Sequence, residues 1–340
     1  MKILFFSHNF YPDIGGIEVN SEIFATEFVA LGADIKLVTW TQEIGNKIFD
    51  YEVVRNPDIK KLFALFRWSD IIFENNPVMR LSWMNLFFKR PRVVGLQTWI
   101  RRMDGKKSFI DRTKKLWVNN ANGVVAISEA VKKHTCKKAV IIGNPYRSVL
   151  FRLETDTALR NKDFVFLGRL VSDKGADMCI ELIHQLTQKF KRQFHLTIIG
   201  DGPEMSRLKT MTSELGLKNH VEFKGYLRGK QLATVLNQYR FLLVPSRWEE
   251  PFGNVALEGM ACGCIPIVSD GGGLPDAAGD AGVVFKRNSQ SDFLDKTLDL
   301  LSDDKKQKQL ALAAKSHLKN YTEKVVGQRY FEILMKALNQ

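Results

Sequence analysis

The sequence predicts an α/β fold with two Rossmann-like, doubly wound parallel-sheet domains that face a central crevice. The chain has 340 residues with 45% hydrophobic side chains, which suits two domains of about 150 residues each. Short apolar runs rich in β-branched residues alternate with helical patterns. This alternation stops near residues 144–155 and then begins again, so one α/β domain follows another along the chain.

The first domain is expected over residues 1–148. Its predicted strands are KILFF, DIKLVTW, DIIFE, RVVGLQT and GVVAIS, and a helix from about Glu18 to Leu31 follows the first of them. Continuously apolar strands are typical of a parallel sheet that is covered on both faces. The opening run is broken by His8, Asn9 and Pro12 and lacks a small-residue cleavage site, which indicates a buried strand and not a signal peptide.

The second domain is expected over residues 149–322. It contains the strand patterns DFVFLG, FHLTIIG, VEFKG, FLLVP and CIPIVS, with predicted helices at about 175–190, 204–215 and 254–262. A final helix from about Glu323 to Leu338 can pack on either domain, and we group residues 323–340 with the first. Because ligands of doubly wound sheets bind beyond the carboxyl ends of the strands, we expect the site in a crevice between the domains.

Cysteine use and hydropathy argue against disulfide-rich, zinc-binding and membrane-spanning proteins. The four cysteines are too few and too irregularly spaced for a disulfide framework, and Cys262 and Cys264 lack a second Cys or His pair for zinc. No uninterrupted apolar stretch approaches the roughly 20 residues that span a bilayer. We therefore expect a cytoplasmic protein without bound metal or cofactor, whose membrane contact would be peripheral, at the inner face of the cytoplasmic membrane.

The positive charge of the chain is concentrated in its first half. Residues 1–147 hold about +9 of the formal net charge of +13. The segment from Lys89 to Trp117 sets ten Lys and Arg residues beside large apolar ones, so we expect Trp99, Arg101 and Arg102 to meet an acceptor or a membrane. An anionic membrane, a lipid-linked phosphate or a charged glycan would fit this segment, and so would a solvated positive face without a partner. The first domain shows no base-reading module, so no nucleic-acid partner is expected.

The most informative stretch is PSRWEEPFGNVALEGMACGCIPIVSDGGGLPDAAGDAG, residues 245–282. A turn at EPFG precedes a helix that starts at Asn254, which leaves the amides of Phe252, Gly253 and Asn254 without internal acceptors and able to hold sugar hydroxyls or negative charge. Glu258 lies one helical turn further along the same face, where a carboxylate can accept two hydrogen bonds from vicinal hydroxyls.

With EPFG before it and MACG after it, the Glu250-x7-Glu258 spacing resembles the donor-binding segment of retaining glycosyltransferase family 4, glycosyl transferases group 1. The similarity extends along most of the chain and implies a GT-B fold. It also implies that Glu258 binds the ribose of a nucleotide-sugar and that Glu250 lies beside the transferred sugar, where it stabilises positive charge at the anomeric carbon.

Other segments resemble the same family. FVFLGRLVSDKG, residues 164–175, resembles its phosphate-binding strand and loop, which implies that Arg169 and Lys174 grip the donor diphosphate. Two fixed cations would stabilise the charge that builds on the leaving diphosphate, so no metal ion is required. Further contacts to the donor are implied at Gly15, Gly16, Gly168, Gly225, Tyr226 and Leu227.

Two positions depart from the family. Many relatives carry a histidine at the end of a strand in the middle of the first domain, where this chain has Gln97, which can hydrogen-bond a hydroxyl of the acceptor but cannot take its proton. The glycine loop Asp270–Pro275 is followed by Asp276 where the family commonly has glutamate. The first departure fits the retaining mechanism proposed for the family, in which a leaving phosphate oxygen receives the proton of the acceptor.

We therefore expect a metal-independent, retaining hexosyltransferase that uses a UDP-, GDP- or ADP-sugar. Its acceptor would be a glycan or a lipid-linked molecule, in surface polysaccharide, lipopolysaccharide or glycolipid synthesis. Two alternatives stay open, a catalytically silent nucleotide-sugar-binding partner subunit and a nucleotide-sugar epimerase of the same fold. An epimerase needs an acid and a base at the sugar, which the first domain does not clearly offer, and a silent subunit has no need of the cations at 169 and 174.

Overall fold

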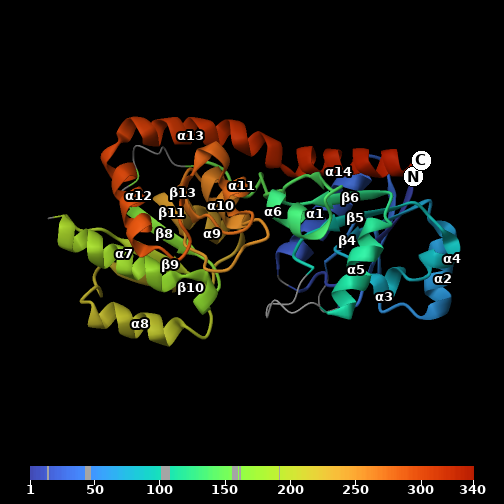
Figure 1. The fold of residues 1–340 in the computed structure, drawn as a ribbon, viewed down its shortest axis with the longest axis horizontal. Helices are drawn as coiled ribbons and strands as arrows, with labels where there is room; N and C mark the ends of the chain where they lie inside the picture. Colours follow the sequence, from blue (N-terminus) through green and yellow to red (C-terminus); the bar gives the residue numbers. More distant parts are fainter. Residues whose placement is uncertain (14, 43–46, 101–107, 155–159, 161, 191) are drawn as a thin grey trace. The chain divides into compact units, whose positions relative to one another are not determined.

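The computed structural model describes residues 1–13, 15–42, 47–100, 108–154, 160, 162–190 and 192–340. These residues form two compact units, the first made of Met1–Pro145 and Glu323–Gln340, the second of Tyr146–Thr322. Each unit is built on its own parallel sheet flanked by helices, so the predicted pair of Rossmann-like domains is confirmed (Figure 1). The chain passes from one unit to the other at Pro145, and the final helix returns it to the first.

The described residues of the first unit form a seven-stranded sheet with the order β3-β2-β1-β4-β5-β6-β7, and every neighbouring pair is parallel. β4 and β5 are buried along their whole length, as expected for central strands covered on both faces. The strands are β1 (Lys2–Ser7), β2 (Asp34–Thr39), β3 (Glu52–Arg55), β4 (Ile71–Asn75), β5 (Arg92–Leu96), β6 (Gly123–Ala126) and β7 (Val140–Ile141).

Helices cover both faces of this sheet. The last helix of the chain packs on the first and on the central strands, with Tyr330 against Phe24 and Phe73 in an aromatic core. The first helix begins at Gly16, two residues before the predicted start, because Gly15 is extended and serves as its N-cap. The helices are α1 (Gly16–Ala30), α2 (Ile59–Trp68), α3 (Met79–Ser82), α4 (Asn85–Phe88), α5 (Phe109–Asn119), α6 (Glu129–Thr135) and α14 (Glu323–Leu338).

The second unit has a six-stranded parallel sheet with the order β10-β9-β8-β11-β12-β13. β8 and β11 are adjacent although three helices and two strands separate them in sequence, so the direction of strand addition reverses between these two strands. The strands are β8 (Lys162–Leu167), β9 (Leu196–Ile199), β10 (Val221–Gly225), β11 (Tyr239–Val244), β12 (Ile265–Ser269) and β13 (Val283–Phe285).

Helices of the second unit contribute apolar side chains to a core beside this sheet. Helix α7 turns Met178, Ile180 and Leu186, among others, into a core that also contains Phe164 and Phe241 from the central strands. The helices are α7 (Ala176–Lys189), α8 (Met205–Glu214), α9 (Gly229–Leu236), α10 (Asn254–Ala261), α11 (Leu274–Ala278), α12 (Gln290–Ser302) and α13 (Asp304–Leu318), with short 3₁₀ turns η2 (Ser172–Lys174), η3 (Gly279–Ala281) and η4 (Lys319–Tyr321).

Candidate active site

Lys174 and Glu250 meet at the carboxyl ends of the two central strands of the second unit. The loop after β8 carries Lys174 in the turn η2, and the loop after β11 carries Glu250. The two side chains form an ion pair and are mostly buried, 20% and 14% exposed. Ser246 Oγ donates a second hydrogen bond to Glu250 Oε1 over 2.7 Å. In doubly wound sheets ligands bind where the strand order reverses, which is the place of this pair.

The loop after β11 is fastened to the loop after β8. Arg247 forms a bidentate ion pair with Asp177, at 2.7 and 3.0 Å, and donates a third hydrogen bond to the carbonyl of Ser172. The amide of Arg247 donates to the carbonyl of Asp173 over 2.8 Å. A fork of five fixed donors suits such planar, multiple contacts. Lys174 and Glu250 are therefore held on two loops that cannot separate easily.

The glycine loop after β12 fixes the backbone of Glu250. Gly273 donates its amide hydrogen to the Glu250 carbonyl over 2.7 Å, and Glu250 and Gly272 form a parallel bridge. Gly272 has a φ of +67°, and a Cβ there would lie 2.1 Å from the Glu250 carbonyl oxygen, so only glycine allows this approach. The loop that we expected to face a phosphate thus has a direct structural task, which is to place Glu250.

Glu258 lies one turn along α10, whose N-cap Gly253 has a φ of +114°. Phe252 is buried and its ring packs on Tyr321, with 5.8 Å between ring centroids, while Asn254 is the first helical residue. Burial raises the pKa of Glu258 to about 7, and the positive charge of Arg147 works in the opposite direction. A ligand that donates hydrogen bonds to this half-buried carboxyl group would stabilise its charged form.

The remaining predicted donor contacts lie at the same edge of the second sheet. β8 ends just before Gly168, and Arg169 is exposed with no hydrogen bond or ion pair to its side chain in the described part of the chain. Gly225 ends β10 with a φ of +66° and accepts the amide hydrogen of Gly200 at 2.8 Å. Tyr226 is 55% exposed and Leu227 partly so. The order of the strands brings these loops beside one another.

In the first unit Gly15 and Gly16 form the start of α1, and Gln97 lies just beyond the end of β5. Gln97 is only 5% exposed, and its side chain accepts from Asn20 over 2.9 Å and donates to the Tyr330 hydroxyl over 3.5 Å. Its amide group is therefore committed inside the unit.

The described residues of the basic segment do not all lie at the surface. Trp99 is buried against His134, with the rings edge to face at 5.3 Å. Arg92 lies in the core, where it pairs with Glu74 at 3.0 Å and its guanidinium stacks 4.1 Å from the Trp117 ring. Arg101 and Arg102 lie outside the described residues. Arg92 and Trp99 thus serve the packing of the unit, which a count of basic and aromatic residues did not reveal.

One polar residue of the site, Ser246, was missed from the sequence. A buried polar network inside the first unit was missed as well. It joins α1 to the central strands, and in it Asn75 donates to Ser21 Oγ at 2.6 Å and Ser7 and Ser21 share a hydrogen bond of 2.7 Å. Asn20 belongs to the same turn of α1. Polar residues on the buried side of an otherwise apolar helix are the signal that could have identified them, since such groups need partners.

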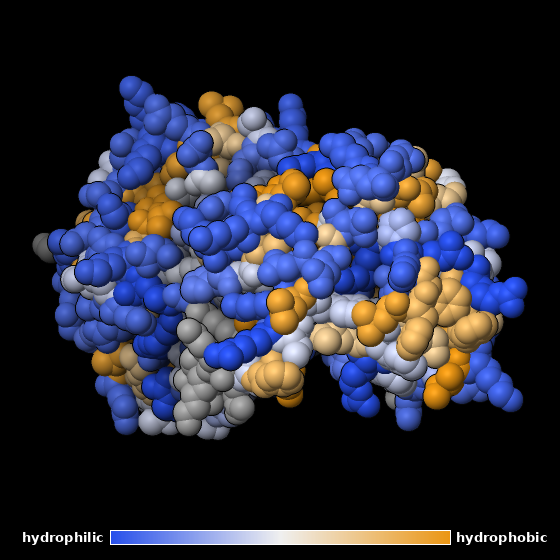
Figure 2. Space-filling model, turned by 45° about the vertical axis from the view of Figure 1, so that its right-hand side comes forward, coloured by the Kyte–Doolittle hydropathy of each residue, from blue (hydrophilic) through white to orange (hydrophobic). Residues whose placement is uncertain are grey.

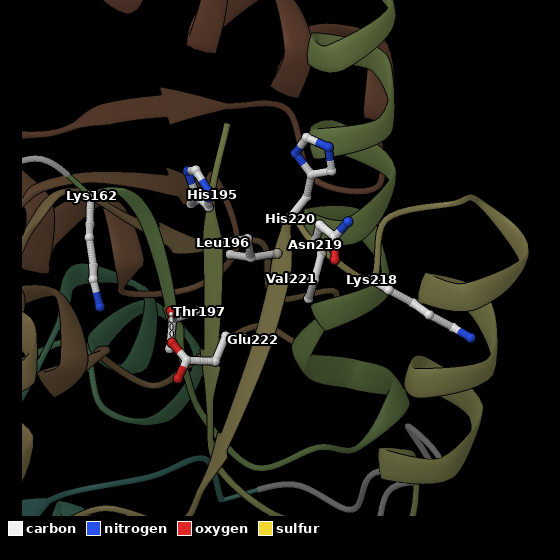
Figure 3. Close-up of a pocket in the computed structure, with 9 residues that line it drawn as sticks. All are labelled: Lys162, His195, Leu196, Thr197, Lys218, Asn219, His220, Val221 and Glu222. Atoms are coloured by element: carbon white, nitrogen blue, oxygen red, sulfur yellow. Dashed lines mark hydrogen bonds between the residues drawn. The ribbon is translucent and has the colours of Figure 1, made fainter. Parts of the chain in front are cut away.

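A second hollow of about 300 Å³ lies at the other edge of the second sheet, where β8, β9 and β10 begin. Figure 3 shows Lys162, Thr197 and Glu222 on one side of it, whereas His220 and Lys218 point away from them. Thr197 donates to Glu222 over 3.2 Å, and Lys224 pairs with Glu222 at 2.6 Å. These side chains do not converge on one point and lie far along the strands from Glu250, so this hollow is not the predicted donor site.

Some kinds of site are not found in the described part of the chain. It holds no group of three or more His, Cys, Asp or Glu arranged to bind a metal ion. All four cysteines are buried free thiols, not disulfides. Among the helices that the structure describes, none has both the length and the apolar character to cross a bilayer.

Residues 151–317, nearly the whole second unit, match the sequence profile of the glycosyl transferases group 1. The second unit thus carries the sequence pattern of that family. Curated relatives include the gpi3 subunit of phosphatidylinositol N-acetylglucosaminyltransferase from Schizosaccharomyces pombe, 24% identical over 86% of this chain and 71% of the relative. D-inositol 3-phosphate glycosyltransferase from Corynebacterium jeikeium is 27% identical over 69% of this chain and 59% of that enzyme. The chain thus spans less than two thirds of the latter relative's length.

Solved structures of glycosyltransferases resemble the chain along its full length. Anabaena Alr3699/HepE in complex with UDP superposes with a TM-score of 0.82 at 20% identity and covers 98% of this chain and 100% of that one. At this identity the likeness shows the fold, which is GT-B. The match to glycosyl transferases group 1 and the GT-B fold agree with the expectations drawn from the sequence.

Proposed function

We propose that this glycosyltransferase moves a hexose-type sugar from a nucleotide-sugar donor to a glycan or lipid-linked acceptor, with retention of configuration and without a metal ion. The observation that carries the proposal is the pairing of Lys174 with Glu250 at the point where the strand order of the second unit reverses. A cation and a carboxylate placed side by side match the two opposite charges that develop when a glycosyl diphosphate bond breaks.

The second unit supplies the groups that the donor needs. Arg169 and Lys174 would hold the diphosphate, and because negative charge grows there as the bond breaks, they stabilise the transition state more than the ground state. Glu250 would lie beside the sugar ring and offset positive charge at the anomeric carbon. Glu258 would accept hydrogen bonds from the ribose hydroxyls, and Tyr226 with Leu227 would border the base.

The proton of the acceptor would pass to the leaving phosphate. Gln97 is an amide and has no basic atom for it, and both ends of its side chain are bonded to Asn20 and Tyr330. As the glycosidic bond breaks, the oxygen of the leaving diphosphate becomes basic. This oxygen stays on the face of the sugar ring to which the diphosphate was bound. Proton transfer to that oxygen, with attack from that face, gives retention of configuration.

The relatives suggest which donor to try first. One solved structure of this fold holds UDP, so UDP-sugars come before GDP- and ADP-sugars. Two of the curated relatives are named for phosphatidylinositol and inositol 3-phosphate, which favours an acceptor that carries a phosphate or a lipid. We place the enzyme in surface polysaccharide, lipopolysaccharide or glycolipid synthesis, at the cytoplasmic side of the membrane.

The proposal is tested by release of nucleoside diphosphate from a panel of UDP-, GDP- and ADP-sugars in the presence of EDTA. Slow hydrolysis of one donor by the wild type, lost in both Glu250→Ala and Arg169→Ala, is the expected result and also identifies the donor. Turnover that stops on addition of EDTA would refute the metal-independent mechanism. Binding of a donor without turnover, across a broad set of lipid and glycan acceptors, would instead indicate the silent binding subunit.

A further inference from the structure

An exposed apolar surface covers one end of the first unit. It is formed by Ile59 and Phe63 on α2, by Trp83, and by Leu86 and Phe87 on α4, which are between 42% and 74% exposed. Phe88 on α4 connects the two helices, because its ring packs on that of Phe63 with 5.1 Å between the ring centroids. The rings of Trp83 and Phe87 also pack together, with 6.1 Å between their centroids. Figure 1 shows α2, α3 and α4 together at this end of the unit, and Figure 2 shows apolar surface gathered there among hydrophilic atoms.

This surface is unusual because α4 buries none of its residues although three of its four are Leu or Phe. Helix α2 already buries Leu62, Leu65 and Phe66 on its other face, so Ile59 and Phe63 are not needed for its packing. Contiguous apolar side chains that a unit leaves exposed are typical of a docking site.

Basic residues outnumber acidic ones around the apolar surface. Residues 59–69 and 76–100 contain seven Lys and Arg and no Asp or Glu. Two of the seven are paired, Lys61 with Glu52 and Arg92 with Glu74. The acidic residues that flank α2 are also occupied, since Asp58 caps the helix and Asp70 accepts from the Lys2 amide. The cations that remain can therefore attract an anionic partner.

A hollow of about 310 Å³ adjoins the apolar surface, and Leu86, Lys89 and Arg90 are among the residues that line it. Lys89 is exposed at a left-handed turn with φ of +52°, which Asn85 fixes by exchanging two hydrogen bonds of 2.9 Å with the backbone of Arg90. The Nε atom of Arg90 is buried without a hydrogen-bond partner among the described residues, while its Nη2 donates to the carbonyl of Arg67 over 3.4 Å. A buried donor without an acceptor favours a ligand that supplies one, such as a phosphate oxygen.

We propose that the surface formed by Ile59, Phe63, Trp83, Leu86 and Phe87 docks onto an anionic lipid bilayer, with Lys89 and Arg90 taking lipid phosphates in the adjoining hollow. Large apolar side chains rimmed by Lys and Arg are the composition that binds the boundary between headgroups and acyl chains. A second copy of the chain fits less well, because two such surfaces face to face would bring the unpaired cations of each against those of the other. Docking is independent of the transfer reaction proposed above.

The test is flotation of the full chain with vesicles of phosphatidylcholine alone and with about one third phosphatidylglycerol. We expect binding to the anionic vesicles only, weakened by salt. Leu86→Ser/Phe87→Ser and Lys60→Glu/Lys89→Glu should each weaken binding at least about tenfold, since Lys60 is also exposed, next to Ile59 on α2. Phe109→Ser/Ile110→Ser is the matched control, since these residues are also exposed but lie on α5, outside the surface. All variants should keep the wild-type melting temperature, because the replaced side chains are already exposed.

Three outcomes would overturn the proposal. The first is equal binding to both kinds of vesicle without salt dependence. The second is loss of binding in the α5 control while Leu86→Ser/Phe87→Ser still binds. The third is a wild-type dimer in solution that binds no vesicles and becomes a monomer in Leu86→Ser/Phe87→Ser, because the surface would then be a subunit interface. None of these readouts depends on donor turnover, so failure of docking and failure of the transfer reaction can be told apart.

Discussion

Lys174 and Glu250 neutralise each other across the loops that follow β8 and β11, and Ser246 adds a hydrogen bond of 2.7 Å to the same carboxylate oxygen. Without a donor the cation and the carboxylate therefore have each other as partners. In the proposed reaction, a bound diphosphate would give Lys174 a second anion to contact, and Glu250 would become available to the sugar. The two loops would keep both charges in place at the carboxyl edge of the sheet.

Glu250→Gln should lower the rate of sugar transfer by about 10²- to 10³-fold, because an amide keeps the size of the side chain but loses the charge that offsets the anomeric cation. The measurement is kcat for nucleoside diphosphate release. Glu249→Gln is the control, since Glu249 is the preceding residue and pairs with Arg287 at 3.4 Å instead of Lys174. Equal loss in the two variants would mean that Glu250 acts only through the structure of the loop.

Lys174→Met should reduce kcat more than it weakens donor binding, because the lysine already has a carboxylate partner in the free enzyme and its gain comes as negative charge grows on the leaving diphosphate. We expect a loss of about 10²-fold in kcat and a change in KM below about tenfold. Lys189→Met, an exposed residue at the far end of α7, serves as the control. A purely KM effect would show that Lys174 binds donor and transition state equally.

Most strands of both units could be predicted from the sequence because they contain short apolar runs, and β4 and β5 are buried throughout. The short strands β3, β7 and β13, which lie at the sheet edges, were missed. Candidate residues such as Arg169, Tyr226 and Glu250 could be located in the chain because they lie in loops that follow strands. The contacts of Gln97 could not, since its partner Tyr330 is 233 residues away. Likewise, the pairing of Arg92 with Glu74 depends on the packing of Trp117 against both, which no local pattern records.

Donor affinity should fall as the pH is lowered through about 7, because burial raises the pKa of Glu258 to about 7 and only the ionised carboxylate accepts two hydrogen bonds from the ribose. Binding then favours the charged form and releases a proton. The dissociation constant of an intact nucleotide-sugar, whose diphosphate does not titrate in this range, should rise about tenfold from pH 8 to pH 6.

Glu258→Gln is the matched variant for this pH dependence. It should bind the donor as weakly as the wild type does at low pH, with no change between pH 6 and pH 8. The same carboxyl group makes the wild type less stable as the pH rises from about 4.5 to 7, since the unfolded state ionises first, and Glu258→Gln should remove this slope as well. A wild-type dissociation constant that stays constant with pH would contradict the placement of Glu258 at the ribose.

Gly200→Ala should destabilise the second unit and weaken donor binding together. Gly200 follows β9 with a φ of +144°, and a Cβ there would lie 1.8 Å from the carbonyl oxygen of Gly168, the residue before Arg169. The backbone must move to admit the methyl group, so we expect a loss of about 3 kcal/mol in the free energy of unfolding, measured by urea denaturation.

Gly216→Ala is the control that distinguishes a steric clash from the cost of a positive φ. Gly216 also has a positive φ, +70°, but nothing lies within 4 Å of the added methyl group. It should cost about 1 kcal/mol and leave donor affinity unchanged. Equal losses in the two variants would mean that the close approach of the loops after β8 and β9 does not hold Arg169 in place.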